Sequence, residues 1–169
     1  NVSILNGGFK GWANGGNKVA TGENSITPAS FKTKLNKKYF ASFSEVQKAQ
    51  KGKGQQCLID ARPAAFFTGD KKHAKARIPG RLANARNLQE GNLIDDSFKM
   101  KPSSAIKSQF GGLDGVEQYK GYISYCNTGH WAATVWFGLS EIAQIPNVKM
   151  YDGGMTHWTS NPKRKVDLG

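Results

Sequence analysis

Short apolar runs alternate with longer stretches of helical period along most of the chain. We expect strands at residues 39–41, 57–60, 122–125 and 148–151, because each run is brief and is bounded by Gly, Lys or polar residues. Apolar residues recur at spacings of three and four over residues 131–143, which predicts a helix with one face toward the core. Strands that alternate with helices are typical of a parallel sheet, since each crossover must pass over a face of the sheet. The pattern therefore predicts an α/β fold.

Two more helices are predicted from their first turns. Hydroxyl side chains at residues 42–44, with Glu45 close behind, are typical of a capped helix start. Pro102 predicts a second start at residues 102–104, because proline fits the first turn of a helix.

One internal repeat indicates more than one structural unit. Residues 1–12 match residues 147–158 at five of twelve positions, including two adjacent glycines and the final Trp. Because residues 147–158 end the strand–helix pattern, we interpret residues 1–12 as the C-terminal tail of a preceding, related domain. Residues 13–26 are rich in Gly and Asn and are predicted to be a linker. Residues 27–169 would then form one complete domain.

The net charge of +12 arises from 24 Lys and Arg residues against 12 acidic ones, and it attracts anions. The basic clusters are dispersed and lack interleaved aromatic residues or a nucleic-acid motif, so we interpret them as solvated faces. No apolar run approaches the roughly 18 residues that a membrane span requires. We therefore expect no nucleic-acid partner and no membrane segment.

Cys126 ends an apolar run and begins a short polar loop, residues 127–130, that leads into the 131–143 helix. Such a strand–loop–helix turn points successive backbone N–H groups inward, and the helix N-terminus adds about half a positive charge. This setting stabilises a thiolate, and Gly129 permits the positive φ of a tight bend. We interpret Cys126 as a reactive nucleophile, although a Cys taken alone is as often an inert core residue.

Cys57 lies inside the apolar run 57–60, and we interpret it as packing rather than chemistry. If the two cysteines lay on neighbouring parallel strands, Cys57 would be roughly 10 Å below Cys126 along the strand direction. A disulfide needs Cα atoms within about 7 Å of each other. We therefore predict two free thiols.

Four ordered motifs resemble those of the rhodanese (thiosulfate sulfurtransferase) family. They are residues 57–63 (CLIDARP), 78–80 (IPG), 125–130 (YCNTGH) and 152–158, which begin with DGG and end with Trp. The resemblance implies a rhodanese-like α/β fold, in which a five-stranded parallel sheet is flanked by helices on both faces. It also implies that the active Cys follows the fourth strand. In tandem-domain members the second domain usually carries that Cys, which agrees with Cys126.

The resemblance implies a persulfide cycle on Cys126. Its thiolate takes a sulfane sulfur from thiosulfate or a related small anionic donor, and a thiophilic acceptor, a thiol or cyanide, then removes that sulfur. No metal or cofactor is implied. The Thr128 hydroxyl and the His130 ring would add hydrogen bonds, although a His at a helix start equally often points to water. The loop residues implied to bind the persulfide or substrate are Asn127, Thr128, Gly129, His130 and Trp131.

Two positions depart from the family pattern. Many relatives place Arg where this chain has Trp131, and related tandem enzymes place a donor-binding Arg where it has Phe66. A charge-assisted hydrogen bond is worth about 1.5–3 kcal/mol, so its loss weakens binding of an anionic donor by roughly ten- to a hundredfold unless another cation replaces it. The nearby candidates are Arg62, Arg77 and Lys75.

Arg62 in this position more often forms a structural ion pair in the family, and Asp60 at the strand end is interpreted as structural too. Arg77 is therefore the slightly favoured donor-binding cation, with Arg62 as the alternative.

The sequence leaves three functions to compare. The first is an active sulfurtransferase that uses thiosulfate or a related donor. The second is a persulfide carrier that exchanges sulfur with a protein partner, either a separate first domain or another sulfur acceptor. The third, a Cys-based phosphatase, is disfavoured because the loop has no Arg. The positive charge, the missing initiator Met and the loop sequence resemble exported bacterial rhodaneses, so we expect a periplasmic or otherwise exported protein, with the cytoplasm as the alternative.

Overall fold

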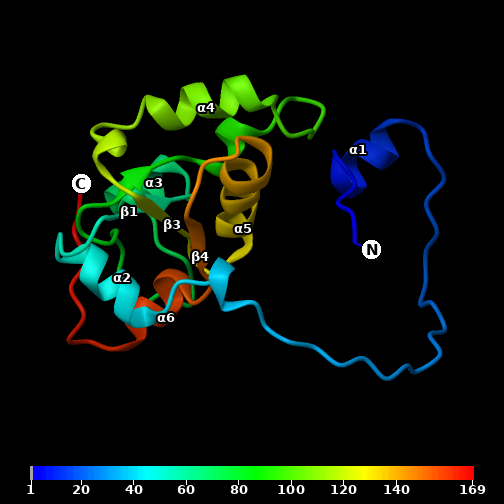
Figure 1. Cartoon of the computed structure of the whole chain (residues 1–169). Coiled ribbons are helices and arrows are strands. Elements are labelled where there is room, and N and C mark those ends of the chain that lie inside the picture. The colour runs from blue at the N-terminus through cyan, green and yellow to red at the C-terminus, as the bar shows by residue number, and fades with distance from the viewer. Residues whose placement is uncertain (1) are drawn as a thin grey trace.

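The computed structural model describes residues 2–169 and has a parallel sheet at its centre (Figure 1). The strands are β1 (Gln56–Asp60), β2 (Arg86–Asn87), β3 (Gly121–Tyr125) and β4 (Val148–Tyr151), in the order β2-β1-β3-β4. All neighbouring strands pair in parallel. The predicted parallel α/β sheet is confirmed, and β1, β3 and β4 lie where three of the strands were expected.

The sheet has four strands among the described residues, so the five-stranded sheet implied by the resemblance is wrong. The predicted strand at 39–41 is replaced by the 3-10 helix η1 (Lys37–Tyr39) and by one parallel bridge between Phe40 and Met150 of β4. The Asn36 side chain accepts a backbone hydrogen bond within η1. This local bond competes with strand pairing, which leaves only a single bridge at the β4 edge.

Helices cover both faces of the sheet, as the resemblance implied (Figure 1). Ile59 of β1 packs in a cluster with α4 and α5, whereas Leu58 faces a second cluster with α2 and α6. The α-helices are α1 (Gly8–Asn14), α2 (Phe43–Gln50), α3 (Ala64–Thr68), α4 (Ser103–Gly111), α5 (His130–Phe137) and α6 (Gly154–Ser160). Two further 3-10 helices are η2 (Glu90–Leu93) and η3 (Val116–Gln118), and a π-helical turn, η4 (Gly138–Ile142), continues α5.

The predicted helix starts are confirmed. The Ser42 side chain accepts from the Glu45 N–H while the Glu45 carboxylate accepts from the Ser42 N–H, which is a complete capping box before α2. α4 begins directly after Pro102. The helix expected over 131–143 is present as α5 and η4, so its last part has π-helical rather than α-helical bonding.

The N-terminal segment lies beside the domain rather than inside it. α1 is joined to the rest by a long extended connection, and residues 17–36 contain no helix or strand (Figure 1). Asn6 Oδ1 accepts a hydrogen bond from the Met100 N–H at 2.9 Å, which ties this segment to the connection before α4. Asn1, the first residue of the predicted tail, lies outside the described residues. Within residues 2–169, no helix has the length and apolar character to span a bilayer.

Candidate active site

Cys126 occupies the turn between β3 and α5, at the carboxyl end of the sheet. Because residues 39–41 form no strand, it follows the third strand of the described chain rather than the fourth. Its side chain is 1% exposed, and the Gly129 N–H donates a hydrogen bond to Sγ at 3.1 Å. Gly129 has a φ of 94° directly before α5, so the chain bends around the sulfur at this residue. At least one backbone dipole is therefore aimed at the sulfur.

Two glycines allow the turn before α6 to close against this loop. A Cβ at Gly129 would lie 2.6 Å from Oδ1 of Asp152, and a Cβ at Gly154 would lie 2.5 Å from the carbonyl oxygen of Cys126. Both distances are shorter than van der Waals contact, and both residues have positive φ. Both positions therefore require glycine if the loop is to keep its shape.

The first turn of α6 fixes the orientation of the loop peptides. The Met155 N–H donates to the Cys126 carbonyl at 2.8 Å, and the Thr156 hydroxyl donates to the Asn127 carbonyl at 3.0 Å. In a trans peptide the N–H points opposite to the C=O. The N–H groups of Asn127 and Thr128 therefore point away from α6, where they are available to an anion held in the loop.

Cys126 opens into a small cavity of about 260 Å³. The Thr128 hydroxyl and Nδ1 of His130 lie 3.2 Å apart at this cavity. Trp131 packs edge to face on Phe66, with 5.9 Å between the ring centroids, so Phe66 lies behind the cavity wall rather than in it. The lining residues are His73, Cys126, Asn127, Thr128, His130 and Trp131.

Arg62 and Asp60 form a buried ion pair behind the loop. Nη2 of Arg62 lies 2.6 Å from Oδ2 of Asp60, and both side chains are at most 2% exposed. Arg62 also donates to the Gly80 carbonyl at 2.9 Å and to Oδ1 of Asn127 at 3.4 Å. Burial acts to lower the pKa of Arg62, but the hydrogen bonds and charge of Asp60 outweigh it and hold that pKa above its ordinary value. Arg62 therefore positions Asn127 and does not line the cavity.

Arg77, the cation favoured from the sequence, also lies outside the cavity lining. Its Nε donates to the Thr159 carbonyl at 3.2 Å and its Nη2 to the Pro162 carbonyl at 3.4 Å. The end of α6 and the residues after it thus hold this guanidinium. Lys75 is exposed and does not line the cavity either. Neither residue is placed to bind a donor beside Cys126. The sequence prediction failed here because the position of a residue along the chain does not fix the direction of a long side chain.

His73 was missed by the sequence reasoning, yet it is the one lining residue that comes from outside the Cys126 loop. Its Nδ1 accepts a hydrogen bond from the Lys75 N–H at 3.2 Å. The only signal for it was a His inside the basic stretch 71–77, which we interpreted from its charge as a solvated face. His73 lines the same cavity as Cys126, and no spacing along the sequence predicts that they lie near each other.

Cys57 has surroundings of another kind. It pairs with Tyr122 across β1 and β3, is 1% exposed, and makes only a weak contact with the Leu58 carbonyl, at 3.7 Å from Sγ. Burial raises the pKa of its thiol to about 11, although the nearby charge of Arg86 acts in the opposite direction. Both cysteines are free, so the prediction of two free thiols is confirmed. Cys57 fills the core and does not reach the Cys126 cavity.

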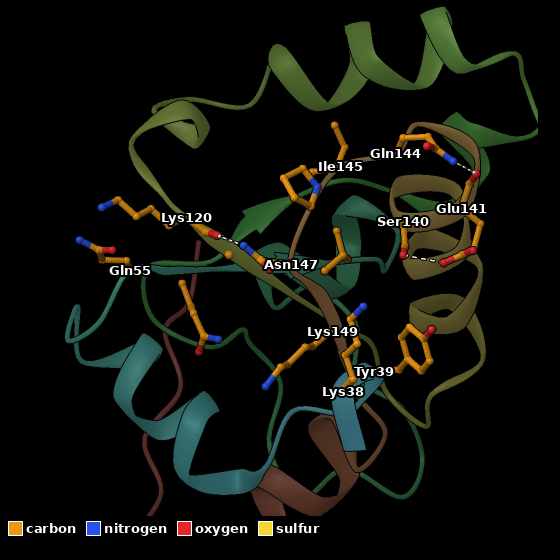
Figure 2. Close-up of a pocket in the computed structure, with 14 residues that line it drawn as sticks. Lys38, Tyr39, Gln55, Lys120, Ser140, Glu141, Gln144, Ile145, Asn147 and Lys149 are labelled. Atoms are coloured by element: carbon orange, nitrogen blue, oxygen red, sulfur yellow. Dashed lines mark hydrogen bonds between the residues drawn. The ribbon is translucent and has the colours of Figure 1, made fainter. Parts of the chain in front are cut away.

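A second cavity, of about 600 Å³, lies at the opposite end of the sheet, where β1, β3 and β4 begin (Figure 2). Lys38, Lys120 and Lys149 contribute to its walls, and Lys149 is paired with Glu45 at 2.6 Å. Its lining contains no Cys or His, so it lacks the nucleophile found at the other end. Across residues 2–169, no cluster of three or more His, Cys, Asp or Glu is arranged to hold a metal ion.

Solved structures with the same fold include two proteins of low identity. The anaerobic ergothioneine biosynthesis enzyme of Chlorobium limicola matches with a TM-score of 0.79 and 18% identity, over 98% of this chain and 41% of that one. Tum1 of Saccharomyces cerevisiae matches with a TM-score of 0.62 and 23% identity, over 77% of this chain and 47% of that one. At these identities the likeness shows the fold alone.

Sequence comparisons identify the family. The chain is 30% identical over 167 residues to the 3-mercaptopyruvate sulfurtransferase of Escherichia coli. It is 29% identical over 170 residues to the thiosulfate sulfurtransferase of Gallus gallus. Both alignments cover 98% of this chain but only 58% and 56% of the relatives, so the chain spans little more than half of their length. Residues 42–161 match the model of the rhodanese-like domain. The chain therefore belongs to the rhodanese-like domain family, and these relatives are sulfurtransferases.

Proposed function

We propose that this domain is a sulfurtransferase that carries sulfur as a persulfide on Cys126. The Cys126 thiolate attacks the outer sulfur of thiosulfate or a related sulfane donor. With thiosulfate, a new S–S bond forms to Cys126, the S–S bond of the donor breaks, and sulfite leaves with the bonding electron pair. A thiol or cyanide then attacks the outer sulfur of the persulfide, and the Cys126 thiolate leaves. With cyanide as acceptor, the product is thiocyanate.

The proposal is carried by the hydrogen bond from the Gly129 N–H to Sγ of Cys126, at 3.1 Å. The backbone N–H groups of Asn127 and Thr128 also point away from α6. A persulfide anion in the loop could therefore accept hydrogen bonds from several N–H groups. The cavity of about 260 Å³ suits a donor of a few atoms rather than a large substrate. Both relatives' names refer to small sulfur donors, thiosulfate and 3-mercaptopyruvate.

Thiocyanate formation tests this function. The protein incubated with thiosulfate and cyanide should form thiocyanate, and Cys126→Ser should lower the rate by about a thousandfold or more, because the nucleophile is lost. Cys57→Ala is the matched control and should keep most of the rate. Replacing thiosulfate by 3-mercaptopyruvate in the same assay ranks the two donors. Thiocyanate formation that survives in Cys126→Ser would contradict the proposal.

A second function, that of a persulfide carrier, is favoured by the lack of cationic side chains in the cavity lining. No Lys or Arg lines it among the residues that the structure describes. A domain that holds a persulfide but captures small anions weakly would exchange sulfur with a protein partner. A stable gain of one sulfur on Cys126 with negligible thiocyanate formation would identify this function. The same lack of Arg argues against a Cys-based phosphatase, because phosphate binding favours bidentate guanidinium contacts.

We also propose the domain organisation predicted from the sequence. Residues 1–12 are the tail of a preceding rhodanese-like domain, residues 13–26 are a linker, and residues 27–169 are the catalytic domain. When the two copies of the internal repeat are aligned, α1 falls on the same positions as α6, which supports the first of these boundaries.

The burial of the two repeat copies supports the same organisation. Val148 and Trp158 are 5% and 2% exposed, whereas their counterparts Val2 and Trp12 are 98% and 43% exposed. Apolar side chains exposed together favour a covering partner, here the preceding domain or a sulfur-accepting protein. Removal of residues 1–26 should leave the thiocyanate rate unchanged and reduce binding of a hydrophobic dye. An exported location stays a prediction, and fractionation of the source cells tests it.

A further inference from the structure

An anionic donor that reaches Cys126 needs hydrogen-bond donors on the cavity wall, since removing an anion from water is costly without them. Arg62 is occupied by Asp60 and by the Gly80 carbonyl, and Arg77 is held at the end of α6. These two guanidinium groups are therefore engaged elsewhere, and Lys75 does not line the cavity. Within the described chain, the cavity offers two imidazoles, a hydroxyl, an amide and an indole instead.

His73 is the lining side chain that faces the loop from a separate segment. Two bonds fix the turn that carries it: the Lys75 N–H donates to Nδ1 at 3.2 Å, and the Ala76 N–H donates to the His73 carbonyl at 2.9 Å. Because Nδ1 accepts, the proton of the neutral ring belongs on Nε2. No acceptor within residues 2–169 bonds to that Nε2–H.

Asn127 holds a buried amide group next to the same cavity. Its side chain is 2% exposed, and its Oδ1 accepts from Nη1 of Arg62 at 3.4 Å, which orients the amide. Its buried Nδ2 has no hydrogen-bond partner in the described chain. A buried amide N–H without an acceptor is uncommon and costs free energy, so the Arg62–Asn127 bond orients this side chain at a cost.

We propose that His73 is the residue that selects anionic sulfur donors, binding the donor's anionic oxygens across the cavity from Cys126. The inference rests on the proposed sulfur transfer, because the donor is the anion in question. His73 then takes the role that the sequence reasoning gave to Arg77. Unlike an Arg, the His73 ring offers the donor a single N–H, the one on Nε2.

Alkylation of Cys126 by two similar reagents tests His73 without sulfur transfer. Iodoacetate is an anion and iodoacetamide is neutral, and both react with the same thiolate. The ratio of their rate constants therefore cancels the thiolate fraction and reports the charge beside Sγ. The two rate constants are measured on the full chain, at the same pH for every variant. Peptide mapping by mass spectrometry separates Cys126 from Cys57.

His73→Gln should lower the iodoacetate-to-iodoacetamide ratio by roughly tenfold, because a charge-assisted hydrogen bond is lost. His73→Arg should keep or raise the ratio, which separates charge from a general structural effect. Lys120→Gln is the control, because it removes one positive charge at the far cavity (Figure 2). In the thiosulfate assay, His73→Gln should raise KM and leave kcat nearly unchanged.

An unchanged ratio in His73→Gln, or a fall equal to that of Lys120→Gln, would overturn the role of His73. That result would leave sulfur transfer by Cys126 untouched. Conversely, a protein that forms neither persulfide nor thiocyanate but shows the expected ratios would refute the proposed function alone.

Discussion

Cys57 lies in β1 and Cys126 directly follows the neighbouring strand β3; both are 1% exposed, yet their surroundings differ. Cys57 lies within β1, where the backbone N–H groups are used in strand pairing and the thiol contacts only core atoms. Cys126 lies just beyond β3, where strand pairing has ended and the Gly129 N–H is free to reach Sγ. Burial alone therefore does not distinguish the two thiols. The direction of the nearby backbone dipoles does.

The largest expected effect concerns the ion pair that joins the two regions. Asp60 ends the strand of Cys57, and Arg62 reaches from it to Asn127 beside Cys126. Asp60→Asn would leave Arg62 as a buried, poorly compensated charge, so we expect a loss of about 3–5 kcal/mol in the free energy of unfolding. Chemical denaturation measures it. Asp114→Asn, at the exposed Asp114–Arg86 pair, is the control and should change little. Equal losses in both variants would mean that Asp60 is not structural.

The next effect concerns the shape of the Cys126 loop. Gly129→Ala and Gly154→Ala would each push a Cβ into an oxygen atom at 2.5–2.6 Å. Because the loop must shift, we expect the thiocyanate rate to fall by roughly a hundredfold, as for a displacement of about 1 Å at a reacting centre. Gly91→Ala, where a Cβ meets nothing within 4 Å, should keep the rate. Full activity in both loop variants would show that the close approach to α6 does not position the sulfur.

The smallest expected effect is a pH dependence of the free energy of unfolding that arises from Cys57. Burial raises its pKa to about 11 in the folded protein, against 9.0 for an ordinary thiol. A group whose pKa is raised on folding stabilises the protein below the unfolded value, so this contribution is present below pH 9.0 and is lost as the pH rises to about 11. Between these pH values the protein should lose roughly 2–3 kcal/mol more than Cys57→Ala, measured by denaturation. Parallel curves for the two proteins would show that Cys57 is as solvated as a free thiol.

The elements with a repeated pattern were predicted from the sequence, and the short or contextual ones were not. β1, β3 and β4 are short, mainly apolar runs, and α2 and α4 have local start signals, so each is encoded within a few residues. β2 has only two residues, too few to show a period. The run at 39–41 has strand-like composition, but the Asn36 side chain and the edge of the sheet reduce it to one bridge.

The candidate site divides in the same way. Cys126 and its loop are contiguous, so motif and strand–loop–helix order were enough to place them together. His73 meets the loop only through the folded chain, and nothing in its neighbours along the sequence shows that contact. Arg77 illustrates the converse, because it is close in sequence to His73 but bonds to carbonyls at the end of α6. Side-chain direction in loops depends on tertiary partners that a pattern of residue types does not contain.

The most direct test of the central claim is the mass of the two cysteine peptides after treatment with thiosulfate. The protein is digested under conditions that preserve persulfides, after the free thiols have been blocked. We predict a gain of one sulfur atom on the peptide with Cys126, its loss on addition of cyanide, and no gain on the peptide with Cys57. Sulfur found on Cys57, or on neither peptide, would contradict the account.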